Sequence, residues 1–116
     1  MTSKKTPPPR DYLGELEQVV LLAVAHLQGE GYGMTVRREI EERAGRSTSV
    51  GALYSTLERL EEKGFVRSRT GPPSAERGGR AKRFFTVTAS GMRALERSRR
   101  MVDAMWEGIP GASDTG

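Results

Sequence analysis

The sequence predicts a small α+β domain that is mainly helical and contains one β-hairpin. Its 116 residues suit one compact domain and leave no room for two independent cores. Apolar residues recur at spacings of three and four in four segments, which is typical of helices. Between the third and the fourth of these, two short segments alternate in strand fashion. The predicted order is therefore three helices, a hairpin and a fourth helix.

The first predicted helix carries a wide apolar face from Leu13 to Leu27 and ends before Gly29. The glycine-rich run from Gly29 to Gly33 predicts a turn, because glycine tolerates positive φ. A second helix is expected over about residues 34–44, with Gly45 just past its end.

The third predicted helix starts after the serine and threonine residues at 47–49, which offer N-cap side chains, and runs to about Lys63. Gly64 terminates it. The apolar stripe that we expect this helix to bury consists of Val50, Leu53, Leu57 and Leu60.

The two alternating segments, Phe65 to Thr70 and Lys82 to Val87, predict a pair of strands joined by a long loop rich in Gly and Pro. Thr88 then offers a cap for the fourth helix. A helix-turn-helix followed by a β-hairpin is the winged-helix plan, in which the hairpin is the wing.

Four regions follow from this reading. We expect residues 1–10 and 110–116 to be disordered tails, residues 11–91 to form the winged helix-turn-helix domain, and residues 92–109 to form an added C-terminal dimerisation helix. Val, Ile, Leu and Phe make up only about a fifth of the chain, so its core is thin and association into a homodimer would stabilise it. The predicted dimer interface consists of Leu13, Leu16, Val20, Met92, Leu95, Val102, Trp106 and Ile109.

The composition excludes several kinds of chemistry. Without cysteine, the chain has no disulfide, thiolate zinc site or cysteine nucleophile, and His26 alone cannot supply a histidine triad or a multi-histidine metal site. We therefore expect no enzyme activity, no cofactor and no metal. The longest apolar run, from Val19 to Ala25, is too short for a membrane span, and residues 1–10 lack a signal-peptide pattern. A cytoplasmic, nucleoid-associated protein is expected.

The basic residues are concentrated rather than spread. The net charge is only +4, but residues 64–83, the predicted wing, hold six Lys and Arg residues against Glu76 alone. Such a block suits an anionic partner, and a wing is where a DNA-binding protein needs it. Double-stranded DNA is therefore the expected partner. The alternative is a protein–protein interaction module whose basic wing binds an acidic protein.

Three motifs resemble the PadR-like transcriptional regulators. They are Gly31-Tyr32-Gly33, the run from Gly51 to Glu61 continuing through Lys63-Gly64-Phe65-Val66, and the run from Gly79 to Gly91. The short C-terminal part is similar to the short subfamily. Two departures are Ser55, where the family often has Pro, and Phe84-Phe85, where it often has Tyr-Tyr.

The resemblance implies a dimeric repressor that binds an inverted-repeat operator in a sequence-specific manner. In such relatives the third helix reads the major groove, the wing touches the backbone or the minor groove, and the first and last helices build the dimer. Some relatives release DNA when a small aromatic effector binds between the subunits. Trp106 is the candidate contact for such an effector in this chain. The alternative is that Trp106 packs in the core of the dimer interface.

The candidate DNA-binding residues lie at the start of the third helix and in the wing. Several have a structural alternative: residues 47–49 as caps, Tyr54 as a packing residue, and Arg59 as the ion-pair partner of Glu58 or Glu62. Lys82 and Arg83 point to opposite faces of their strand, and the sequence does not say which face is inward. The full set is Ser47, Thr48, Ser49, Gly51, Ala52, Tyr54, Ser55, Arg59, Arg77, Arg80, Lys82 and Arg83.

Overall fold

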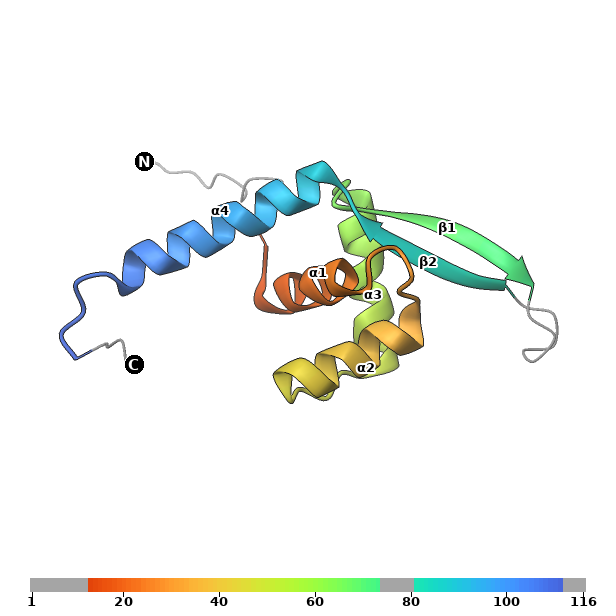
Figure 1. The fold of residues 1–116 in the computed structure, drawn as a ribbon, viewed down its shortest axis with the longest axis horizontal. Coiled ribbons are helices and arrows are strands. Elements are labelled where there is room, and N and C mark those ends of the chain that lie inside the picture. The colour runs from red at the N-terminus through yellow and green to blue at the C-terminus, as the bar shows by residue number, and fades with distance from the viewer. Residues whose placement is uncertain (1–12, 74–80, 112–116) are drawn as a thin grey trace, which may run out of the picture.

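The computed structural model describes residues 13–73 and 81–111 (Figure 1). Its element order is the predicted one, three helices followed by a hairpin and a fourth helix. Within the described residues, none of the helices combines the length and the apolar character that a membrane span requires. The elements are α1 (Glu15–Leu27), α2 (Gly33–Ala44), α3 (Val50–Glu62), β1 (Val66–Pro73), β2 (Ala81–Val87) and α4 (Ala89–Trp106).

The local signals at the helix ends act as predicted. The Ser49 hydroxyl accepts a hydrogen bond from the Ala52 amide at 3.1 Å, and the Thr88 hydroxyl accepts one from the Gly91 amide at 3.1 Å. Gly45 closes α2 with φ of 62°, a conformation that glycine adopts without strain. These short-range contacts fix where α3 and α4 begin.

The core surrounds α1, which contacts every other helix and β2. Its residues Val20, Leu21 and Val24 are fully buried. Figure 1 shows α1 lying between α4 on one side and α2 on the other, with α3 behind it. Burial of this one helix on several sides accounts for a core built from few apolar residues.

The hairpin packs on the helices through one face of β2. Phe85 is 1% exposed and pairs with Ser68 of β1, so the inward face of β2 is the one that carries Arg83, Phe85 and Val87. The amide of Phe85 also donates to the carbonyl oxygen of Gly31 at 2.9 Å. The segment predicted only as a turn therefore adds a short bridge to the sheet.

Val50 differs from the prediction, because its side chain is 53% exposed rather than buried. It is the first residue of α3, so it projects at the end of the helix, before the part that packs on the core. The buried stripe instead begins at Leu53 and includes Thr56, which is 1% exposed.

The fourth helix also differs in its extent. It begins at Ala89 and packs its first half on the core through Gly91, Ala94 and Leu95. It ends at Trp106, because Glu107 is extended and Gly108 has φ of 82°, so the predicted continuation of the helix to Ile109 is wrong. The second half projects from the body of the molecule (Figure 1).

Three residues of the predicted dimer interface lie elsewhere. Leu13, Val20 and Leu95 are buried inside the single chain, so they stabilise its own core. The period of an amphipathic helix identified them as apolar but did not say which neighbour covers them. Leu16 is partly buried against the same core. The exposed members of the set are Met92, Val102, Trp106 and Ile109, and the large exposed apolar residues Leu22, Met101 and Met105 join them.

The predicted tails lie outside the described residues, apart from Pro110 and Gly111, which form a turn.

Candidate nucleic-acid interface

The first two turns of α3 present an exposed surface with no acidic side chain. Gly51, Tyr54 and Ser55 are exposed there, and the capping residue Ser49 is exposed just before them. Glu58 is the first acidic residue of the helix, more than two turns in. This end of the helix is also the positive end of its dipole. The surface therefore accepts an anionic partner without repulsion. Of the remaining predicted residues in this region, Ser47 is exposed and Ala52 is half-buried.

Thr48 does not belong to this surface. It is 7% exposed, and its hydroxyl oxygen is buried with no hydrogen-bond partner in the part of the chain that the structure describes. Its carbonyl oxygen accepts a 2.6 Å hydrogen bond from Nε of Arg37, which joins α2 to the turn before α3. The predicted phosphate contact through the Thr48 hydroxyl does not fit this burial.

Tyr54 lies between α3 and the start of α2. Its side chain is 42% exposed, while its hydroxyl lies so close to Gly33 that a Cβ there would come within 1.9 Å of the oxygen. Gly33 is therefore the residue that lets the Tyr54 ring fit against α2. The Tyr54 side chain is therefore packed against α2 and at the same time partly exposed to solvent.

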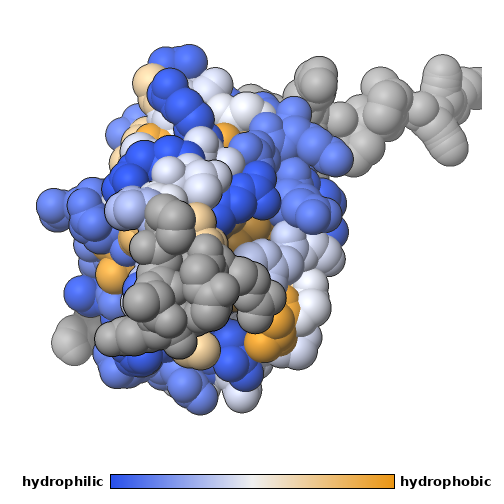
Figure 2. All heavy atoms as spheres, turned by 90° about the vertical axis from the view of Figure 1, so that its right-hand side faces the viewer, coloured by the Kyte–Doolittle hydropathy of each residue, from blue (hydrophilic) through white to orange (hydrophobic). Residues whose placement is uncertain are grey.

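A hollow of about 310 Å³ joins the start of α3 to the base of the wing. It is lined by Met34 and Arg37 of α2, by Val50 and Tyr54 of α3, and by the β2 residues 81–83. Seen from the end where the hairpin projects, hydrophilic residues cover most of the visible surface, with a few hydrophobic residues between them (Figure 2).

Aromatic rings hold the face of β2 that carries Lys82 and Phe84 against the turn between α1 and α2. The Phe84 ring meets the Tyr32 ring edge-on, with 5.7 Å between the centroids. The Lys82 ammonium lies 4.5 Å from the centroid of Tyr32, and the Arg69 guanidinium lies 4.7 Å from that of Phe84. Lys82 is thus held beside the hollow.

Arg83 lies on the other face of the same strand. Its guanidinium forms an ion pair with Glu61 of α3, and its Nε donates to the Ser68 hydroxyl at 3.1 Å. It also stacks on Phe85, 5.3 Å from the ring centroid. These contacts fasten the wing to the C-terminal half of α3, so Arg83 has a structural role that its sequence position did not reveal.

Arg59 has a partner that sequence proximity did not suggest. Its Nε lies 3.5 Å from a carboxylate oxygen of Glu17 in α1. This ion pair with a distant residue takes the place of the local pairs with Glu58 or Glu62 that the sequence suggested. Lys63 donates to both oxygens of Glu17 at 3.0 Å. Glu17 is 6% exposed, and it joins the start of α1 to the end of α3.

The pKa of Glu17 lies below its ordinary value. Burial by itself raises the pKa of this carboxyl, but a hydrogen bond from the Gly14 amide and the nearby Lys63 ammonium outweigh that effect. The carboxylate is therefore charged at neutral pH and remains paired inside the subunit.

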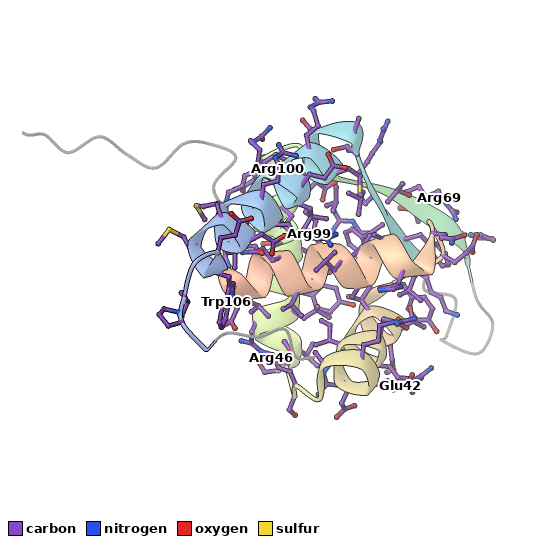
Figure 3. The ribbon with its side chains drawn as sticks, turned by 60° about the vertical axis from the view of Figure 1, so that its left-hand side comes forward. Glu42, Arg46, Arg69, Arg99, Arg100 and Trp106 are labelled. Carbon is purple, nitrogen blue, oxygen red and sulfur yellow. The ribbon has the colours of Figure 1, made fainter. Side chains whose placement is uncertain are left out.

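Further cations lie in the wing loop and on α4. Arg77 and Arg80 lie outside the described residues. On α4, Arg99 pairs with Asp103 at 3.7 Å. Figure 3 shows Arg99 on the side of α4 that faces α1 and Arg100 on the outer side.

A second hollow, of about 500 Å³, lies between α1 and α4. Gln18 and Leu22 line it from α1, and Met92 and Val102 line it from α4. Among residues 13–73 and 81–111, no group of three His, Cys, Asp or Glu side chains is placed to hold a metal ion.

The chain is similar to known proteins in both sequence and fold. The model of the transcriptional regulator PadR-like family matches residues 21–97. A PadR family transcriptional regulator from Eggerthella lenta has 20% identity and a TM-score of 0.66, covering 88% of each chain. None of the curated proteins matches the chain.

Two further solved structures have the same fold. A PadR family transcription regulator from Clostridium difficile is 18% identical with a TM-score of 0.65, over 79% of this chain and 91% of that one. A Streptococcus transcriptional regulator is 25% identical with a TM-score of 0.64, over 85% of this chain and 92% of that one. The predicted winged-helix fold is confirmed.

Proposed function

We propose, since this chain belongs to the PadR-like family of transcriptional regulators, that it is a repressor which binds double-stranded DNA as a homodimer. The operator would be an inverted repeat, and bound protein would exclude other proteins from a promoter. The family consists of transcription regulators rather than enzymes. A protein with this role would be associated with the nucleoid.

The observation that carries this proposal is the acid-free, exposed start of α3 beside the wing. Helix-turn-helix proteins place the N-terminal residues of this helix in the major groove. The acids of α3, Glu58, Glu61 and Glu62, all lie in its second half. Lys82 stands beside the same surface on the wing, where it can neutralise a phosphate.

The projecting half of α4 supports the dimer. Met101, Val102, Met105 and Trp106 are between 43% and 73% exposed there. An exposed apolar stripe of this kind marks an interaction surface. A second copy of the chain, which presents the same stripe, would cover it by two-fold symmetry.

The hollow between α1 and α4 supports an effector site next to this interface. Its volume of about 500 Å³ falls within the range of small-molecule pockets, and Leu22, Met92 and Val102 give it an apolar lining. Trp106, 59% exposed in the single subunit, offers an aromatic surface for a small aromatic molecule held between subunits.

A titration of fluorescent random-sequence duplex DNA at several salt concentrations tests DNA binding. We expect the logarithm of the affinity to fall linearly with the logarithm of the salt concentration. Lys82→Ala should weaken binding to all sequences and make the slope shallower by about 0.9, the value for one phosphate contact.

Arg100→Ala is the matched control, because it removes one positive charge from the outer side of α4. Its slope should stay close to that of the unchanged protein. A Lys82→Ala slope equal to the wild-type slope would refute the phosphate contact. Absence of binding to any duplex at low salt would refute the function and favour an acidic protein partner.

A further inference from the structure

We propose that Val50 reads a thymine in each operator half-site by contact between its side chain and the 5-methyl group of the base. Met34 supports this contact from the start of α2. The proposal rests on the proposed function, because it requires α3 to enter the major groove. The proposed function left open which base α3 recognises and through which residue, and this proposal specifies both.

Val50 and Met34 form an exposed apolar pair on two different helices. Val50 is 53% exposed and Met34 is 50% exposed, and both line the hollow at the base of the wing. Val50 was expected in the core, and the fold leaves it at the surface instead. It is the large apolar side chain in the first turn of α3 that faces away from the core.

The remaining exposed side chains at this end of α3 limit what the helix can read. Gly51, Tyr54 and Ser55 include no Arg, Lys, Asn or Gln, which are the residues that make paired hydrogen bonds to purine edges. Thymine is the base that presents a methyl group in the major groove, and apolar side chains recognise it by contact. The side chains present at the start of α3 therefore favour an A·T pair.

Close approach is possible because Gly51 carries no side chain. A Cβ placed on it would meet no other atom within 4 Å, so the position is open to the surroundings. The backbone at the second residue of α3 can therefore come near the base edges. Val50, its neighbour, would then be close enough to contact the methyl group of a thymine.

The charges around the hollow favour part of a nucleic acid as its occupant. Arg37 and Lys82 line it together with Arg83, which is already paired with Glu61, and no acidic residue lines it among the described residues. An apolar floor with positive side chains around it matches the edge of a base pair flanked by phosphates. An acidic peptide would match the positive charges, but its acidic side chains would make no apolar contact with Val50 and Met34.

The test uses duplexes recovered by selection from a random DNA library with the full-length protein. Each thymine of a recovered site is replaced in turn by deoxyuridine, which keeps the base pair and removes only the methyl group. At one position in each half-site we expect the affinity to fall about three- to five-fold, the effect of one buried methyl group. Replacement of any other thymine should change the affinity by less than about 1.5-fold.

Val50→Ala should abolish this sensitivity, so that the thymine and uracil duplexes bind equally well. Val50→Thr, which keeps the side-chain shape and one methyl group, should retain part of the sensitivity to thymine methyl removal. It replaces the alanine variant in the test if that variant binds DNA too weakly to measure. Glu62→Ala, at the exposed end of the same helix, should keep the full sensitivity. Circular dichroism checks that the variants fold.

Three results would overturn the proposal and leave the proposed function standing. They are selected half-sites without a common thymine, uracil substitutions that have no effect, and a uracil effect that persists in Val50→Ala. Failure to bind any duplex would remove the proposed function and this proposal together, so the two failures are distinguishable.

Discussion

Glu17 is a single buried carboxylate that joins the two ends of the helical core. It accepts hydrogen bonds from Lys63 and from the Gly14 amide, and it pairs with Arg59. Through Lys63 and Arg59 it holds the end of α3 against the start of α1. Because α3 is a continuous helix, this contact also helps to orient its first turns, where we propose that DNA binds.

Replacement of Glu17 by Gln should lower the free energy of unfolding by about 1–3 kcal/mol at pH 7, because hydrogen bonds to a charged group are lost. The folded pKa of Glu17 is depressed, so its contribution is present above the unfolded pKa and is lost as the pH falls through the folded value. The difference between wild type and variant should therefore shrink below about pH 4.3.

Urea unfolding at several pH values measures this difference. Glu62→Gln, which changes an exposed carboxylate on the same helix, is the control and should alter stability by less than about 0.5 kcal/mol. A stability difference for Glu17→Gln that stayed constant from pH 7 to pH 3 would contradict the assigned role of the charge.

The two halves of the fourth helix differ in burial. Its first half packs on the rest of the chain, since Gly91 lies so close to Phe65, the residue before β1, that a Cβ would come within 2.3 Å of the Phe65 carbonyl oxygen. Its second half carries an exposed apolar stripe, and none of its residues belongs to the core that the described residues form. We therefore expect substitutions in the second half to affect assembly and to spare folding.

Met105→Glu tests this division. Met105 is 73% exposed in the single subunit, so the change should leave the circular dichroism spectrum unaltered. In a dimer it would bury an unpaired charge, which is costly. Light scattering at micromolar concentration should therefore find a dimer for the wild type and a monomer for the variant.

Arg93→Glu, at an exposed position in the first half of α4, is the control and should remain dimeric. A wild-type chain that is a folded monomer at this concentration would rule out the proposed dimer.

The whole subunit is elongated, with the wing and the free half of α4 projecting at opposite ends (Figure 1). If α4 pairs two subunits by a two-fold axis, the two α3 helices are related by the same axis. The DNA site must then consist of two half-sites in inverted orientation. Their separation is fixed by the rigid subunits rather than by the DNA.

Selected DNA sites should accordingly contain inverted repeats whose centres lie about 34 Å apart, or a multiple of that distance. An insertion of about half a helical turn between the half-sites should weaken wild-type binding at least ten-fold, because the second subunit then faces the wrong side of the duplex. The insertion should not affect Met105→Glu, which binds each half-site independently. Equal binding to both spacings by the wild type would contradict the two-fold arrangement.

Much of the fold could be predicted because its signals are local. The caps at Ser49 and Thr88 and the closing Gly45 act through residues a few positions away. The alternation of apolar and polar residues likewise predicted both strands. In the structure β1 begins one residue later than predicted, at Val66, and continues to Pro73, while β2 begins one residue earlier, at Ala81. The motifs of the third helix and the wing identified the family.

The candidate site could be predicted only in outline. Its location at the start of α3 and in the wing could be predicted from the charge distribution and the element order. Whether each single residue there is exposed, buried or paired could not. Thr48 and Val50 are two positions apart, yet the fold buries the first and exposes the second. Arg59 and Arg83 turn out to hold the fold together through Glu17 and Glu61.

The sequence by itself determined the elements, their order and the position of the basic wing, since these depend on propensities and periods within a few residues. The tertiary structure alone decided which apolar residues fill the core, which face of β2 points inward, and which cations have acidic partners in distant segments. Helical and strand periods show that a face is apolar, but only the packing of remote elements determines what covers it. Val20 and Val50 are the clearest pair: both are apolar residues on amphipathic helices, and their neighbours in space place one in the core and the other at the surface.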